Sequence, residues 1–230
     1  MKKIVLLAAA LLLTPLLATA ADLANGERIN RNCALCHGAF AQGAKGRLSP
    51  RLAGLPREYL IKAMEDYRSG VRRNPTMMET TGLANMSNND IEDIAAYLNM
   101  LDLTRDARFD VRPISMGSDL AVGETIFMDE CKDCHGRDGR GKPNKEAPPL
   151  TGQHGEYIFS TIKLFQAKLR NHDNDPEDET FKAYSDQQIL NTVAFISTLD
   201  DKLVVPGDMF RPPMLPPMRP RMTNVMQANA

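Results

Sequence analysis

The sequence predicts an all-α protein that contains two tandem copies of one domain, and three observations lead to this fold. The five-residue pattern C-x-x-C-H occurs twice, at residues 33–37 and 131–135, and uses all 4 cysteines of the 230-residue chain. From Cys33 onward, adding 98 to a residue number leads to a similar residue in the second half, without a gap. Apolar residues in both halves recur at intervals of three and four, which is the spacing of amphipathic helices.

Each copy is predicted to contain three main helices. The first covers about residues 25–34 or 122–133 and leads into the cysteine pair, and the second covers about 58–68 or 156–168. The last helix begins after Ser87 or Ser185, each followed three residues later by Asp90 or Gln188 in the pattern of a capping box. Further matched pairs are Tyr59 with Tyr157, Tyr67 with Phe165, and Arg72 with Arg170.

The ends of the chain differ from the repeat. Met1-Lys2-Lys3, an apolar run over residues 4–17 and Ala18-Thr19-Ala20 predict a signal peptide over 1–20, cleaved near Ala20. Its apolar run is too short to span a bilayer, and no later stretch approaches the required length. Domains are then expected at 21–110 and 111–203. From Val204 to the end, proline and methionine dominate and predict an extended or disordered tail.

The repeated motif indicates covalent haem. In C-x-x-C-H, the two thiols add across the vinyl groups of the porphyrin and the histidine binds the iron. Cys33, Cys36, Cys131 and Cys134 are therefore the expected attachment sites, with His37 and His135 as iron ligands. A zinc site is the weaker interpretation, because 94 residues separate Cys36 from Cys131. A disulfide framework would not require a histidine after each pair. The absence of tryptophan also suits cores that are partly filled by flat cofactors.

Over about residues 23–203 the pattern resembles class I cytochrome c, and the duplicated form is similar to the dihaem cytochrome c4 family. The resemblance implies two covalently bound haem c groups and a periplasmic location. It also implies transfer of single electrons between redox proteins, with a terminal oxidase as acceptor. In this family a methionine about eight residues before the capping serine binds the iron from the other side. Met78 lies nine residues before Ser87 and is the expected ligand, with Met77 as the alternative.

The second domain departs from this pattern, because Met77 and Met78 correspond to Asp175 and Pro176 and the chain has no methionine between Met128 and Met209. Four interpretations of the sixth position remain open at this point. His172 or Lys182 binds the iron, a tail methionine binds it, or the iron is five-coordinate or binds water. The tail candidates are Met209, Met214, Met218, Met222 and Met226. His154 is expected to make a structural hydrogen bond instead.

These observations predict a soluble electron carrier that is not itself an enzyme. Without the signal peptide the chain has 26 basic and 29 acidic residues, a balance that does not suggest a nucleic-acid partner. Peripheral association with a membrane complex stays open. The alternative hypothesis is a haem enzyme, or the cytochrome subunit of a dehydrogenase, that uses an atypically ligated second haem for peroxide or sulfur-compound chemistry. The sequence contains no acid/base constellation that favours this alternative.

Overall fold

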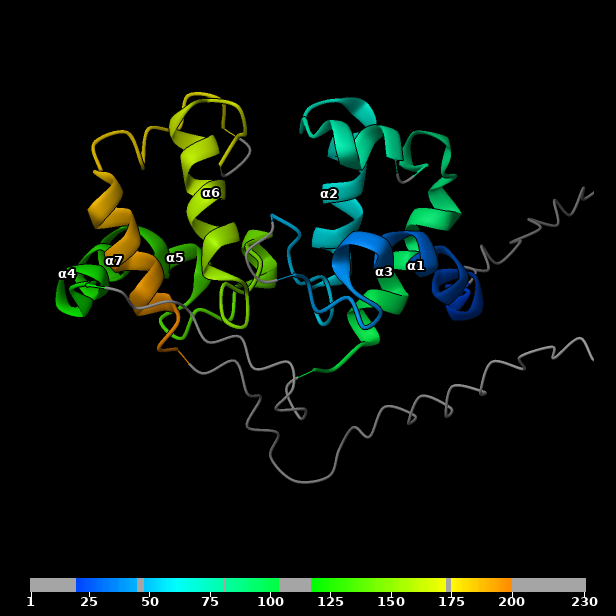
Figure 1. The fold of residues 1–230 in the computed structure, drawn as a ribbon, viewed down its shortest axis with the longest axis horizontal. Coiled ribbons are helices and arrows are strands. Elements are labelled where there is room, and N and C mark those ends of the chain that lie inside the picture. The colour runs from blue at the N-terminus through cyan, green and yellow to red at the C-terminus, as the bar shows by residue number, and fades with distance from the viewer. Residues whose placement is uncertain (1–19, 45–47, 81, 104–116, 173–174, 200–230) are drawn as a thin grey trace, which may run out of the picture.

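A computed structural model describes residues 20–44, 48–80, 82–103, 117–172 and 175–199. These residues form two helical units that lie side by side. Helices α2 (Arg57–Ser69) and α6 (Gly155–Gln166) face each other where the two units meet (Figure 1). Within the described ranges there are helices, loops and two isolated β-bridges but no strand. None of the described helices is long and apolar enough to cross a membrane. The predicted signal peptide and tail lie outside the described residues.

The first unit comprises α1 (Leu23–His37), α2 (Arg57–Ser69), the π-helical turn η1 (Thr76–Thr80), the 3-10 turn η2 (Leu83–Asn85) and α3 (Asn88–Met100). Helices α1 and α2 both pack against α3. The core between them is mostly aliphatic, and its most completely buried members include Leu60, Ile94 and Leu98.

The second unit repeats this arrangement. It comprises α4 (Leu120–Ile126), the π-helical turn η4 (Phe127–Cys131), α5 (Lys132–His135), the 3-10 turn η5 (Pro143–Lys145), α6 (Gly155–Gln166) and α7 (Asp186–Ile196). Helix α4 packs against α7 as α1 packs against α3. The all-α duplicated fold predicted from the sequence is therefore confirmed, with helix ends shifted by up to three residues.

Both predicted capping boxes are present. The Ser87 hydroxyl accepts from the Asp90 amide at 3.1 Å, and the Asp90 carboxylate accepts from the Ser87 amide at 3.1 Å. Ser185 and Gln188 make the same reciprocal pair at 3.3 and 3.0 Å. These bonds satisfy amides that the helix itself leaves unpaired, so they fix where the last helix of each unit begins.

A glycine in each first helix marks its crossing with the last helix. A Cβ atom on Gly26 would lie 2.3 Å from the Asp93 carbonyl oxygen, and one on Gly123 would lie 2.1 Å from the Asn191 carbonyl oxygen. Asp93 and Asn191 are repeat partners, so the two crossings are equivalent. Only glycine allows the backbones to approach this closely.

The second copy contains one extra residue between this crossing and the haem motif. Gly26 and Gly123 are 97 positions apart, whereas Cys33 and Cys131 are 98 apart. The wider π-helical turn η4 absorbs the additional residue directly before the second cysteine pair. Helix α4 can therefore cross α7 as α1 crosses α3, and the cysteines and histidine of the second motif still lie at the position equivalent to that of the first.

Reciprocal arginine–tyrosine contacts join the two units. Arg72 Nη2 donates to the Tyr157 hydroxyl at 2.8 Å, and Arg170 Nη2 donates to the Tyr59 hydroxyl at 3.4 Å. Since each residue is the repeat partner of its counterpart, these contacts follow an approximate twofold relation between the units. The first contact is clearly the tighter of the two.

A second group of interface contacts is not reciprocal. Gln153 accepts from the Arg51 amide and donates to the Arg51 carbonyl, both at 2.9 Å, while Arg51 Nη1 donates to the Gly152 carbonyl at 3.3 Å. The buried His154 ring donates through Nε2 to the Gln42 carbonyl at 2.9 Å. The structural hydrogen bond expected of His154 is thus confirmed, and it connects the two units.

Candidate haem centres

Each C-x-x-C-H motif ends in a histidine with a fixed tautomer. His37, at the end of α1, is 4% exposed and its Nδ1 lies 2.8 Å from the Pro50 carbonyl oxygen. His135 makes the same bond to Pro148, also at 2.8 Å. Because a carbonyl oxygen can only accept, Nδ1 carries the proton in both rings and Nε2 carries the lone pair. Burial also lowers the pKa of His37, which favours the neutral imidazole that a metal requires.

The cysteines of both motifs are half-buried free thiols. Burial raises the pKa of Cys33, and burial together with the nearby Glu130 raises the pKa of Cys131 to about 12. In the described part of the chain, no cluster of three or more His, Cys, Asp or Glu side chains could hold a metal ion. The thiol pair beside each histidine fits covalent attachment of haem.

The methionines expected above the first haem lie in the turn η1. Met77 and Met78 are both half-buried and pack against a cluster formed by Tyr67, Leu83 and Ile91. Asn74 orients this turn, because its side-chain oxygen accepts from the Met77 amide at 3.2 Å and its carbonyl accepts from the Met78 amide at 2.9 Å. The turn thus brings both thioethers to one cluster, and the preference for Met78 over Met77 stays a prediction.

The corresponding loop of the second unit presents His172 instead. Its Nδ1 lies 3.0 Å from Asp178 Oδ2, and its ring centroid lies 5.1 Å from that of Phe165 and 4.9 Å from that of Phe181. Lys182, the other predicted side-chain ligand of this loop, is 70% exposed and pairs with Glu179 at 2.8 Å. That carboxylate raises the pKa of Lys182 and keeps it protonated, which opposes iron binding. The tail methionines lie outside the described residues.

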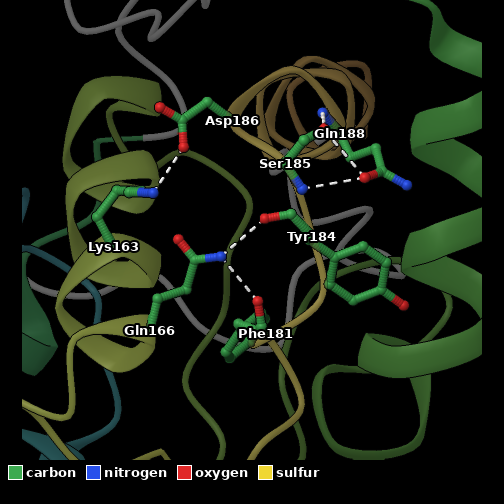
Figure 2. Close-up of polar contacts among 7 residues, drawn as sticks. All are labelled: Lys163, Gln166, Phe181, Tyr184, Ser185, Asp186 and Gln188. Atoms are coloured by element: carbon green, nitrogen blue, oxygen red, sulfur yellow. Dashed lines mark hydrogen bonds and ion pairs between the residues drawn. The ribbon is translucent and has the colours of Figure 1, made fainter.

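The end of this loop is tied to α6 (Figure 2). Gln166 Nε2 donates to the carbonyl oxygens of Phe181 and Tyr184, both at 2.8 Å, and Lys163 pairs with Asp186 at 2.6 Å. In the first unit Arg68, the repeat partner of Gln166, makes the matching bond to the Met86 carbonyl at 3.0 Å. The loops that precede α3 and α7 are therefore held at the same point by different side chains.

Sequence reasoning missed two residues that hold this loop in place, one within it and one on α6. Asp178 belongs to an acidic run that resembles a solvated surface, yet its carboxylate is 18% exposed and is shared between His172 and Thr180. The sequence pattern predicts only that Gln166 belongs to a helix. The sequence did contain an indication of this role for Gln166, because its repeat partner Arg68 is also a long side chain that can donate a hydrogen bond.

Two helical units, each with a thiol pair next to a histidine that donates Nδ1–H to a proline carbonyl, define a duplicated c-type cytochrome of class I. Comparison with known families matches residues 23–102 and 120–200 to the family described as Cytochrome c. The chain belongs to the cytochrome c family and, within it, to the dihaem cytochromes similar to cytochrome c4. It accordingly carries two covalently bound haem c groups and transfers electrons.

Individual relatives agree with this assignment. Cytochrome c4 of Pseudomonas aeruginosa is 34% identical over 166 residues, which cover 71% of this chain and 80% of that protein. The thiosulfate dehydrogenase electron acceptor of Stutzerimonas stutzeri is 30% identical over 202 residues, covering 81% and 92%. The crystal structure of reduced recombinant cytochrome c4 from Pseudomonas stutzeri matches with a TM-score of 0.62 at 27% identity, covering 78% of this chain and all of that one.

Proposed function

We propose that this protein is a periplasmic carrier that takes single electrons from one redox protein and delivers them to another in a respiratory chain. Cys33 and Cys36 hold the first haem in this proposal, and Cys131 and Cys134 hold the second. His37 and His135 would bind the irons through Nε2, and Met78 would supply a thioether ligand to the first iron. The observation that carries the proposal is the paired histidine geometry, in which both rings donate Nδ1–H to a proline carbonyl at 2.8 Å.

The haem groups supply a reversible one-electron change at iron, and the chain supplies fixed surroundings for that change. The hydrogen bonds from His37 and His135 stop the ligand rings from rotating and increase their basicity. The aliphatic cores limit the access of water. A soft methionine thioether on the first iron favours the ferrous state and raises its reduction potential.

The interface between the units supports transfer within the molecule. Arg72 with Tyr157, Arg170 with Tyr59, and the Arg51–Gln153 pair restrain the two units relative to each other. A fixed relation between two haem positions gives an electron a defined route from one to the other. Periplasmic location is supported by the N-terminal signal pattern and by the maturation of covalent haem outside the cytoplasm.

A second candidate function is supported by the similarity to a thiosulfate dehydrogenase electron acceptor, of which the chain covers 92%. In this version the protein accepts electrons from a dehydrogenase of a sulfur compound, either as a partner or as a subunit. The chemistry on the sulfur compound then belongs to the dehydrogenase. The second haem would act directly on a small molecule only if its sixth position were open.

The test uses mature holoprotein purified from a periplasmic expression host. Mass spectrometry is expected to show two haems per chain, and reductive titration is expected to consume two electrons. Protein reduced with dithionite and freed of excess reductant should then be reoxidised by membranes that contain terminal oxidases, whereas the double variant Cys131→Ala/Cys134→Ala should deliver half as many electrons. Turnover of peroxide or thiosulfate by the isolated protein, without reoxidation by the membranes, would contradict the carrier function.

A further inference from the structure

The repeat relates the surroundings of His172 to those of the methionines in the first unit. Met77 and Met78 pack against the cluster that contains Tyr67 and Leu83. The repeat partners of Tyr67 and Leu83 are Phe165 and Phe181, and the His172 ring contacts both of these aromatic rings, at 5.1 and 4.9 Å between centroids. The second unit therefore places an imidazole against the wall where the first unit places its thioethers.

Hydrogen bonding fixes which nitrogen of His172 is available. Asp178 Oδ2 lies 3.0 Å from Nδ1, and an ionised carboxylate can only accept, so Nδ1 carries the proton and Nε2 the lone pair. The other oxygen of Asp178 accepts from the Thr180 hydroxyl at 2.6 Å and from the Thr180 amide at 3.2 Å. The carboxylate is thus held from one side and orients the imidazole on the other, as His37 is oriented by Pro50.

The wall behind the imidazole is itself anchored. Phe181 stacks on Phe165 at 5.7 Å between centroids, and the Phe181 carbonyl accepts from Gln166 on α6 (Figure 2). The competing side chain Lys182 is one residue from Phe181 but is largely exposed and paired with Glu179. The loop therefore directs a histidine inward and a lysine outward.

We propose that His172 binds the second haem iron through Nε2 and that Asp178 is its positioning residue. The inference rests on the proposed function, because it requires a haem held by Cys131, Cys134 and His135. With His135 on the other side, the second haem has two imidazole ligands. A histidine in place of methionine lowers the reduction potential, and the Asp178 carboxylate increases the basicity of the ring and lowers it further.

The consequence is an ordered pair of haems. The first, with histidine and methionine, has the higher potential, and the second, with two histidines, has the lower. An electron that enters at the second haem then passes to the first. The ferrous iron of the second domain becomes ferric, and the ferric iron of the first becomes ferrous. The second unit is the entry side of the carrier and the first unit is the exit side.

Electron paramagnetic resonance and near-infrared spectra of the oxidised holoprotein test the ligand assignment. Wild-type protein is expected to show two low-spin haems and one methionine charge-transfer band. His172→Met should double that band and raise the lower reduction potential, and His172→Ala should make the second haem high-spin. His154→Gln is the matched control in the same domain and should leave both haem spectra unchanged.

Asp178→Asn separates positioning from ligation. The amide oxygen can still accept from Nδ1–H, so both haems stay low-spin, but loss of the negative charge raises only the lower potential. A chain truncated after Lys202 should retain the wild-type spectra. Two methionine bands in the wild type, loss of a band on truncation, a high-spin wild-type haem, or unchanged spectra in His172→Ala would each overturn the assignment. The carrier function fails separately, if reduced wild-type protein is not reoxidised by oxidase-containing membranes.

Discussion

Replacing Tyr157 by Phe removes one hydroxyl from the domain interface and leaves the ring in place. The hydroxyl accepts from Arg72 at 2.8 Å, and hydrogen bonds to charged groups contribute about 1.5–3 kcal/mol. The Arg72 guanidinium also lies 4.4 Å above the Tyr67 ring, so it cannot turn to solvent without losing that contact. At about 2–4 °C per kcal/mol for a chain of this size, the unfolding midpoint should fall by about 3–12 °C.

Tyr59→Phe is the matched control, because it removes the equivalent hydroxyl from the reciprocal contact. The Arg170–Tyr59 distance of 3.4 Å exceeds the usual range, and its loss should cost less than about 1 kcal/mol. Calorimetry of both holoprotein variants, with haem content checked by mass, compares the two losses directly. Equal shifts, or a larger shift in Tyr59→Phe, would refute the idea that the Arg72 contact dominates the interface.

Three further predictions concern the helices and the interface. Gly26→Ala should lower the urea midpoint more than Gly70→Ala, because the new Cβ at position 26 would lie 2.3 Å from the Asp93 carbonyl oxygen. Gly70 has no neighbouring atom within 4 Å, so its replacement strains only a left-handed backbone. Equal effects of the two substitutions would contradict the close crossing of the helices. Ser87→Ala should cost about 1 kcal/mol through loss of the capping box, and an unchanged urea midpoint would argue against it. Burial alone would raise the pKa of Tyr157, but neighbouring guanidiniums outweigh it and lower the value to about 8. Since this value lies below the unfolded value of about 10, the ionised phenol stabilises the fold as the pH rises from 8 to 10, and this contribution is lost as the pH falls through 8. Carbon-13 NMR of labelled tyrosine should show one early titration that Tyr157→Phe removes.

The sequence was sufficient where structure follows from local pattern. The capping boxes at Ser87 and Ser185 formed as expected because their partners lie three residues away. The constant offset of 98 located the second domain, because helices and loops kept their lengths after Cys33. The structural role of His154 was also foreseen, since a histidine between a turn and a helix commonly finds a carbonyl partner.

Other features were not predicted. The extra residue absorbed by η4 was visible in the sequence, because residues 22–29 and 119–126 are identical at six of eight positions at an offset of 97, whereas the offset from Cys33 onward is 98. Tyr59 and Arg72 were recognised only as repeat matches, because a periodic pattern does not reveal a partner in the other domain. Asp178 was hidden in an acidic run, since composition alone does not distinguish a solvated carboxylate from one that holds a histidine.

A spectroelectrochemical titration of the full mature holoprotein, followed in the near-infrared, tests the carrier with two unequal haems most directly. As the applied potential is lowered, we predict two separate one-electron steps per chain. The methionine band of the first haem should disappear in the first step, because that haem has the higher potential. A single one-electron step, or loss of the methionine band in the second step, would contradict the account.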